Sequence, residues 1–243
     1  MEFDPTVFGI TIGRIIETYG AAVRAWLSPL FHLGFLAVIF LLITKGNRFR
    51  KAFTLYFLIN YIWLFVAIGI YASIQLFQQA GPGYLAVYGA TPILLVVIIA
   101  LLISEWRKQQ NNFDLSQVPT WRWVVVVPMM LWGFYYPNWR FDGSGFDWNL
   151  GQLLFGNFGL MGCPVTMLAL STLFLIYPRV NRHLFQVMTM YAIMLGGAMV
   201  AVGYKTDIPF FALGVISLLL ILVTTISARF KASVKAQPNL NTR

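Results

Sequence analysis

The chain has 243 residues, of which 59% are hydrophobic and only 10% are charged, and its 17 Lys and Arg outnumber its 8 Asp and Glu. A soluble globular domain carries about 25% charged residues and about 45–50% apolar ones, so this composition excludes that class. Intrinsic disorder is excluded as well, because a disordered chain combines low hydrophobicity with high charge. The composition is typical of a membrane protein.

The first element in chain order is a predicted amphipathic helix over residues 4–26. Arg14, Glu17 and Arg24 recur at helical spacing and give it one polar face, while apolar side chains fill most of the remainder. Such a helix lies in the membrane interface, and Pro29 is expected to mark its end. The alternative is one long first helix that enters the membrane obliquely.

Seven stretches contain no Asp, Glu, Lys or Arg, and we predict that each one spans the membrane as a helix. Lipid offers no partner to backbone N–H and C=O groups, and these runs are continuously apolar rather than alternating, which excludes β-barrel strands. About 20 residues cross a bilayer. The shortest stretch is flanked by Trp121, Arg122 and Trp139 as interfacial anchors, with Arg122 reaching toward water. The predicted spans are 28–44, 52–74, 84–104, 123–138, 160–178, 184–203 and 208–228.

The charges of the connecting loops orient the chain. Thirteen of the 17 basic residues fall on the side that holds the C-terminus, and six of the eight acidic residues fall on the other side. Because cytoplasmic loops carry the excess of Lys and Arg, we expect the N-terminus outside and the C-terminus in the cytoplasm. Glu2 and Asp4 make the start of the chain unlike a signal peptide, so the first spans are expected to be retained. The predicted fold is one all-α membrane domain over residues 1–243, with seven transmembrane helices in the bacterial inner (cytoplasmic) membrane.

The longest outer loop, within residues 135–164, combines aromatic side chains, two carboxylates, one Arg and several glycines. Loops of this composition often carry binding, although an aromatic belt with a glycine-rich turn gives the same pattern. Lys205 follows the sixth span beside Asp207, where a local ion pair is expected. The residues predicted to form a binding surface on this side are Trp139, Arg140, Asp142, Asp147, Trp148, Lys205 and Asp207.

Cys163 is the only cysteine, and it lies at the start of the fifth span among the methionine-rich spans four to six. Thiolate and thioether sulfurs are soft ligands that suit Cu(I), so Cys163 with Met161, Met167 and Met199 is a candidate metal site. The alternative is that the cysteine is a small packing residue and the methionines fill gaps in the core. The sequence identifies no other cofactor.

The predicted spans hold no ionisable Asp, Glu, Lys or Arg, which argues against a proton-coupled transporter. We expect Asn60 to bond a neighbouring helix and His32 to make an interfacial hydrogen bond. Small residues spaced by four in the sixth span are expected to let two helices approach closely. These residues are Ala192, Gly196, Gly197 and Ala201.

Several short motifs spread along the chain resemble the domain-of-unknown-function 6064 family of bacterial polytopic membrane proteins. The most specific is Phe158-Gly159 followed by Cys163-Pro164-x-Thr166. The others are Tyr19 with Ala22-Val23, then Trp63, Gly69 and Tyr71, then Gly196-Gly197-Ala198 and Asp207. The family pattern has proline where this chain has Gly162, and a histidine commonly occupies the position of Ala72. The resemblance implies a compact helical membrane bundle with the Cys-Pro element near its outer surface, and it implies no activity.

Two functional classes fit these observations. The first is a non-catalytic membrane subunit or accessory protein that packs against a membrane-protein partner or a second copy of itself. The alternative is a permease or channel for a small neutral or soft-metal solute. An enzyme is not expected, because two histidines and one cysteine supply no base–nucleophile pair. The basic loop 45–51 is expected to meet anionic lipid headgroups of the bilayer rather than nucleic acid.

Overall fold

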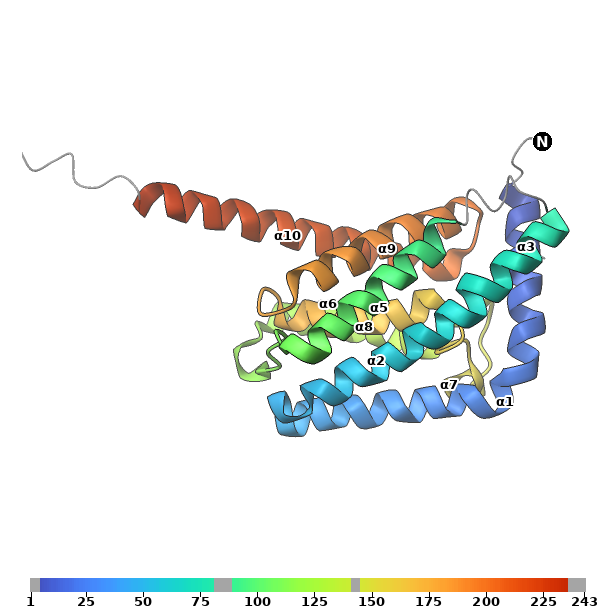
Figure 1. The fold of residues 1–243 in the computed structure, drawn as a ribbon, viewed down its shortest axis with the longest axis horizontal. Helices are drawn as coiled ribbons and strands as arrows, with labels where there is room; N and C mark the ends of the chain where they lie inside the picture. The colour runs from blue at the N-terminus through green and yellow to red at the C-terminus, as the bar shows by residue number, and fades with distance from the viewer. Residues whose placement is uncertain (1–4, 81–88, 141–144, 236–243) are drawn as a thin grey trace, which may run out of the picture.

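The computed structural model describes residues 5–80, 89–140 and 145–235, and within these ranges the chain is mostly helical (Figure 1). The α-helices are α1 (Pro5–Lys45), α2 (Arg50–Leu64), α3 (Ser73–Ala80), α5 (Ala90–Lys108), α6 (Thr120–Tyr135), α7 (Gln152–Phe155), α8 (Gly162–Ile176), α9 (Arg182–Ala201) and α10 (Ile208–Lys235). The 3-10 helices η1 (Gly46–Phe49), η3 (Leu115–Gln117) and η4 (Lys205–Asp207) join some of them, and the π-helix η2 (Phe65–Ala72) links α2 to α3. Strands β1 (Asn138–Arg140) and β2 (Gly145–Asp147) pair as an antiparallel hairpin.

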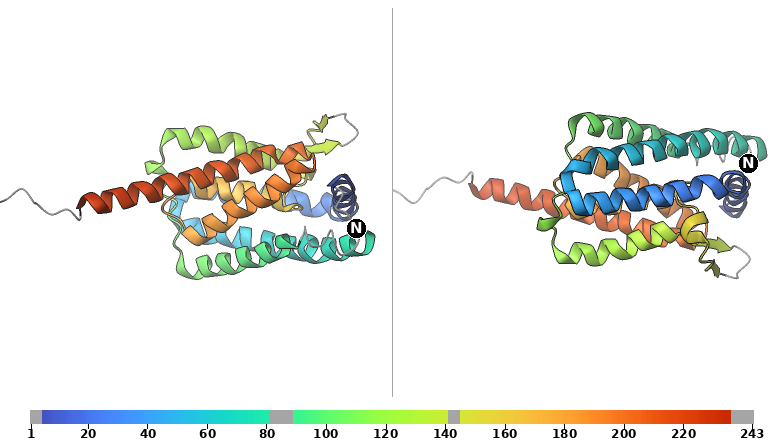
Figure 2. Two further views of the ribbon diagram at one scale, coloured as in Figure 1. Left: turned by 90° about the horizontal axis from the view of Figure 1, so that it is seen from above. Right: turned by 90° about the horizontal axis from the view of Figure 1, so that it is seen from below.

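The long helices pack side by side along a common axis, and α8 lies in the middle of the bundle (Figures 1 and 2). Helices α2, α6, α9 and α10 all contact α8. Every residue of α8, from Gly162 to Ile176, is buried. A helix that is apolar on all sides is stable only when other elements surround it. The core of the bundle is therefore occupied by α8.

Four helical stretches are long and apolar enough to cross a membrane. The longest, Ala25–Gln78, contains the predicted spans 28–44 and 52–74 and folds back on itself at η1. The other three are Ala90–Lys108, Arg182–Ala201 and Lys205–Phe230. Large apolar side chains face outward on α1, α2, α5, α6, α9 and α10. A contiguous apolar exterior of this extent is the surface of a membrane protein.

The N-terminal region differs from the prediction of a separate helix over residues 4–26. Helix α1 continues through Pro29 as one helix of 41 residues. It bends strongly between an N-terminal arm and a C-terminal arm, so that the first arm runs across the end of the bundle (Figure 1). Proline lacks an N–H and its ring clashes with the carbonyl four residues earlier, so it bends a helix without necessarily ending it.

Several predicted spans differ from the helices at their ends. Helix α8 stops at Ile176, short of the predicted 178, because Pro178 disfavours helical geometry at the residue before it. Helix α10 runs past the predicted 228 to Lys235, since nothing in that stretch of sequence breaks a helix. Helix α5 starts at Ala90, and residues 84–88 of its predicted span lie outside the described part of the chain.

Among the described residues, most of the exposed cations lie at one end of the bundle. There η1 and the start of α2 meet the segment that follows α5, because Arg50 donates to the Gln109 side chain at 2.8 Å and Asn47 donates to Asn112 at 2.7 Å. The exposed basic residues at this end include Lys45, Arg48, Lys51, Arg107, Lys108 and Arg182. The opposite end holds the hairpin, η4 and the N-terminus of α8. We call the two ends the basic end and the hairpin end.

Candidate functional site

Asp207 is the centre of a buried polar cluster at the hairpin end. Its side chain is fully buried, and the hydroxyl of the equally buried Tyr136 donates to its Oδ1 atom. The Cys163 thiol contacts the same carboxylate. A buried carboxylate is stable only when donors compensate the loss of water, and Tyr136 supplies such a donor to Oδ1, whereas Oδ2 has no hydrogen-bond partner among the described residues.

Three helix ends converge to build this cluster. Tyr136 is the left-handed residue that closes α6, with its N–H donating to the Trp132 carbonyl. Cys163 belongs to the first turn of α8, and Asp207 immediately precedes α10. The partial positive charge of a helix N-terminus favours an anion beside it, and both α8 and α10 begin next to this cluster.

Thr206 fixes the neighbouring turn against α6. Its hydroxyl donates to the Pro137 carbonyl at 3.0 Å, and its own carbonyl accepts from the indole N–H of Trp132 at 2.9 Å. Thr206 and Asp207 therefore both point inward, where they hold η4 on the end of α6.

Lys205 takes a different place from the one predicted for it. Among the described residues it forms no ion pair with Asp207, because Asp207 is buried and Lys205 is exposed. The Lys205 ammonium instead lies 4.9 Å from the centre of the Trp139 ring. A cation over an indole face is a favourable contact that keeps the charge in water. The expected local ion pair is therefore wrong.

The hairpin carries an aromatic cluster in addition to the predicted Trp139 and Trp148. Phe146 on β2 lies 5.0 Å from Trp139, 5.5 Å from Trp148 and 5.6 Å from Trp132, measured between ring centres. Tyr135 stacks on Trp148 at 6.0 Å. Trp148 is 62% exposed, so this cluster meets the surroundings of the protein. The position is suited to an interfacial aromatic belt.

The remaining members of the predicted outer-loop surface divide into two groups. Asp147 stands opposite Asn138 in the hairpin and is half-buried. Asp142 and the side chain of Arg140 lie outside the described part of the structure. The structure thus brings Trp139, Trp148 and Lys205 to one surface and separates Asp207 from them by burial.

The candidate sulfur ligands are all buried. The Cys163 thiol meets oxygen groups of Asp207 and Tyr136. Met161 precedes α8, and Met167 lies against Gly133 of α6, where an added Cβ would sit 3.0 Å from the methionine sulfur. The described residues contain no group of three or more His, Cys, Asp and Glu side chains suited to a metal ion. Met199 lies near the end of α9.

The residues of α9 that were predicted to allow close helix packing lie in different environments. An added Cβ at Gly196 would lie 3.0 Å from the Phe211 backbone nitrogen, and one at Gly214 would lie 3.0 Å from Ala192. Ala192 and Gly196 therefore lie where α9 and α10 approach most closely. Gly197 is half-buried beside the Phe211 ring, and Ala201 is exposed.

Asn60 differs from its predicted role as a bond between helices. It is buried, but its amide nitrogen donates to the Tyr56 carbonyl at 2.8 Å, one turn earlier in α2. A side chain that returns to its own backbone satisfies a buried donor without linking two helices.

His32 makes its hydrogen bonds inside the bundle rather than at an interface. It is fully buried, with Nδ1 2.8 Å from the Ser28 carbonyl oxygen and Nε2 3.1 Å from the Phe134 carbonyl oxygen. The Ser28 hydroxyl lies 2.8 Å from the Gly156 carbonyl oxygen. These contacts tie the bend to α6 and to the loop before α8, so His32 is a structural link within the bundle.

A second buried polar group, at the basic end, escaped the sequence analysis. Glu105 is 1% exposed and accepts from the Asn111 backbone N–H at 2.9 Å and from the Asn181 amide at 3.2 Å. Asn181 also accepts from the Leu184 N–H, which caps α9. Both oxygens of Glu105 are thus engaged by loops that join helices. The sequence feature that could have identified Glu105 is its position directly after a long apolar run.

Arg122 turns inward rather than reaching toward water. Its Nη1 donates to the carbonyl of Leu175 at 2.9 Å and also to the carbonyl of Tyr177. The last carbonyls of a helix have no partner within the helix. Arg122 therefore caps the C-terminal end of α8 from α6, which explains why so apolar a helix is accompanied by a buried cation.

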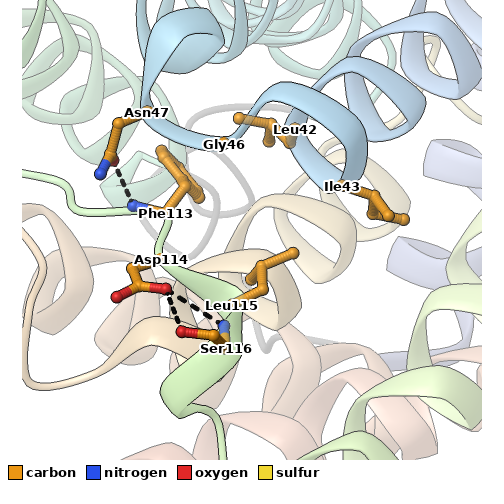
Figure 3. Close-up of a pocket in the computed structure, with 8 residues that line it drawn as sticks. All are labelled: Leu42, Ile43, Gly46, Asn47, Phe113, Asp114, Leu115 and Ser116. Atoms are coloured by element: carbon orange, nitrogen blue, oxygen red, sulfur yellow. Dashed lines mark hydrogen bonds between the residues drawn. The ribbon is translucent and has the colours of Figure 1, made fainter.

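A hollow of about 350 Å³ opens at the basic end, between the end of α1 and the loop before α6 (Figure 3). Leu42 and Leu115 line it together with polar residues. Asn47 accepts from the Phe113 N–H at 2.6 Å, and Asp114 accepts from the Ser116 hydroxyl at 2.6 Å. The polar groups of the rim thus already bond to one another.

No protein-family model, no curated protein and no solved structure matches this chain.

Proposed function

We propose that the protein is a non-catalytic integral membrane subunit that packs against another membrane component. The supporting observation is the filled centre of the bundle, where all fifteen residues of α8 are buried. A conducting pore needs a polar or water-filled path, whereas here the central volume is occupied by apolar side chains. A scaffold uses its interior for packing and its outer faces for partners.

The proposed topology has seven crossings, with the N-terminus outside and the C-terminus in the cytoplasm of a bacterial cell. The collection of exposed cations at one end supports this direction, since cytoplasmic loops attract Lys and Arg. The four long apolar stretches support membrane insertion, with α6 and α8 as the shorter crossings. The N-terminal arm of α1 runs across the hairpin end and fits an interfacial helix on the outer leaflet (Figure 1).

The alternative proposal is a permease for a small neutral or soft-metal solute. One observation favours it: Asp207, Cys163 and Tyr136 form a buried polar cluster below the hairpin end. Buried ionisable groups in membrane proteins often mark a path for ions or protons. Membership of the 6064 family also stays a prediction.

The test is purification from native membranes in a mild detergent, followed by mass spectrometry of the co-eluting proteins. A subunit co-elutes with a defined partner in constant proportion and loses thermal stability when that partner is removed. A stable protein that elutes alone and carries a solute into liposomes, with a flux lowered by Cys163→Ala, would replace the subunit proposal with the permease.

A further inference from the structure

The hollow between η1 and η3 opens at the edge of the membrane (Figure 3). The apolar helical stretch Ala25–Gln78 reverses direction at η1, so this turn lies where the chain leaves the hydrocarbon and enters it again. At the same end the Lys51 ammonium lies 5.8 Å from the centre of the Trp106 ring, and tryptophan is typical of the boundary between hydrocarbon and water. The hollow is therefore at the level of the lipid headgroups.

The walls of the hollow change from polar to apolar across its width. Figure 3 shows Asn47 and Asp114 at one side and the side chains of Ile43 and Leu115 toward the other. Ile43 is 60% exposed, so this apolar wall is open to the surroundings of the protein. A phospholipid changes in the same way from its headgroup to its acyl chains. The volume of about 350 Å³ lies within the range of small-molecule sites, which is about 300–1,000 Å³.

Charges of both signs border the hollow. Asp114 lies on one wall, where its Oδ1 atom accepts from Ser116 at 2.6 Å and its Oδ2 atom lies 3.7 Å from Nη1 of Arg179. The longer distance exceeds that of a hydrogen bond, and a carboxylate oxygen accepts more than one donor, so Oδ2 can accept from a ligand. On the facing wall the exposed Lys45 and Arg48 immediately flank the two η1 residues that line the hollow.

We infer that this hollow binds a phospholipid whose headgroup carries a primary ammonium, as in phosphatidylethanolamine. The phosphate lies near Lys45 and Arg48, the ammonium donates to Oδ2 of Asp114, and the acyl chains run over Ile43 and Leu115. Opposite charges at the two walls complement the two charges of this headgroup. The inference requires a chain that is inserted in a membrane and goes beyond the proposed function, because a subunit and a permease are equally able to hold such a lipid.

Other ligands complement the hollow less completely. Phosphatidylglycerol offers no cation to Asp114 and brings a second negative charge to the same space. Phosphatidylcholine carries a quaternary ammonium, which has no N–H to donate to Oδ2. A free phosphate or a soluble headgroup leaves the apolar wall at Ile43 and Leu115 uncovered. Sequence alone predicted only that loop 45–51 meets anionic headgroups, and the position of Asp114 opposite this loop adds the requirement for an ammonium.

The first test is a titration of the full chain in mild detergent, followed by native mass spectrometry. The ligands are phosphatidylethanolamine, phosphatidylcholine and phosphatidylglycerol with identical acyl chains, and water-soluble phosphoethanolamine. We expect phosphatidylethanolamine to bind at least ~5-fold more tightly than the other two lipids. Equal affinities for the three lipids would overturn the inference. Phosphoethanolamine that binds as tightly as the lipid would overturn it as well, because the hollow would then be a site for a soluble ligand.

Matched variants assign the two halves of the headgroup. Asp114→Asn is expected to reduce the preference for phosphatidylethanolamine over phosphatidylcholine to less than about twofold, since the acceptor of the ammonium loses its charge. Lys45→Ser with Arg48→Ser should weaken all three lipids about fivefold, because they share the phosphate. Arg107→Ser with Arg182→Ser removes two exposed cations that do not line the hollow and should change nothing.

The ratio of two lipid affinities is the deciding quantity, because a partly unfolded variant binds all lipids less well and leaves the ratio unchanged. An Asp114→Asn variant with the full preference for phosphatidylethanolamine contradicts the inference. A photo-reactive residue at position 116 then identifies the occupant in native membranes. An adduct with phosphatidylethanolamine supports the inference, whereas adducts with another lipid class or with a protein alone overturn it.

Discussion

The Tyr136 hydroxyl donates to Oδ1 of Asp207, and neither side chain is exposed. Tyr136→Phe removes this donor and leaves a buried carboxylate with less compensation, so we expect the free energy of unfolding to fall by about 1–3 kcal/mol. Combination with Asp207→Asn should cost less than the sum of the single changes, with a coupling of about 0.5–3 kcal/mol. Thermal and denaturant unfolding in detergent measure both quantities, and strict additivity would show that the two groups act independently.

Tyr135→Phe is the matched control for this pair. Its hydroxyl lies 3.3 Å from the Asn149 carbonyl oxygen in an exposed position, so its loss should change the unfolding free energy by less than about 0.5 kcal/mol.

The membrane class and most of the helices are predictable from the sequence, because an uninterrupted apolar run of about 20 residues has few other stable structures. The buried positions of Asp207, Glu105 and Arg122 are not predictable in the same way. Each lies at the edge of an apolar run, where a charge faces either water or the end of a neighbouring helix. Which direction it takes depends on tertiary packing, such as the unpaired carbonyls of α8 that Arg122 caps.

The bend of α1 is likewise only partly predictable from the sequence. Pro29 predicts an interruption, but a proline is compatible with a helix end or with a kink. The bonds of His32 and Ser28 to α6 and to the loop before α8 hold the bent geometry, and these partners are more than 100 residues away in the sequence. The local sequence therefore predicts an interruption near Pro29, but it does not determine whether the helix ends there or bends.

Arg122→Met is expected to lower the free energy of unfolding by about 1–3 kcal/mol, because the carbonyls of Leu175 and Tyr177 lose their donor while remaining buried. Arg122→Lys should recover part of this loss, since an ammonium reaches fewer acceptors at once. Arg182→Met, which removes an exposed cation at the same end, should change stability by less than about 0.5 kcal/mol. Equal effects of Arg122→Met and Arg182→Met in thermal unfolding would contradict the capping role.

Gly159 and Gly203 form a second matched pair. Both have a positive φ, +80° and +89°, so Ala introduces backbone strain of about 1–2 kcal/mol at either position. At Gly159 the new Cβ would also overlap Cδ2 of Phe31, whereas at Gly203 it meets nothing within 4 Å. Gly159→Ala should therefore destabilise by about 1–3 kcal/mol more than Gly203→Ala. Similar unfolding midpoints for the two variants would show that the bend of α1 adapts to the overlap.

The loop at the basic end should respond to acid through Asp114. The Ser116 hydroxyl and backbone N–H donate to its carboxylate, with a further contribution from Arg179, and together they hold the pKa of Asp114 below its usual value. Folded protein then binds this proton less readily than unfolded protein, so the stabilisation is complete above about pH 4 and disappears as the pH falls through the lowered pKa. Asp114→Asn should lower the unfolding midpoint at pH 7 by more than at pH 3. If Asp114→Asn lowered the unfolding midpoint equally at pH 7 and at pH 3, the ionised form of Asp114 would not be the stabilising one.

Cys163 offers a direct measure of how closed the hairpin end is. The thiol is 4% exposed and contacts Asp207, and only a thiolate reacts with a maleimide. We expect native protein to be labelled at least ~100-fold more slowly than protein unfolded in detergent and urea, because reaction requires local opening of the cluster. Ala228→Cys in a Cys163→Ala background is the exposed control and should react at the same rate in both states. Fast labelling of native Cys163, measured by mass spectrometry over time, would reveal a path from the outer side to Asp207 and would favour the permease over the subunit.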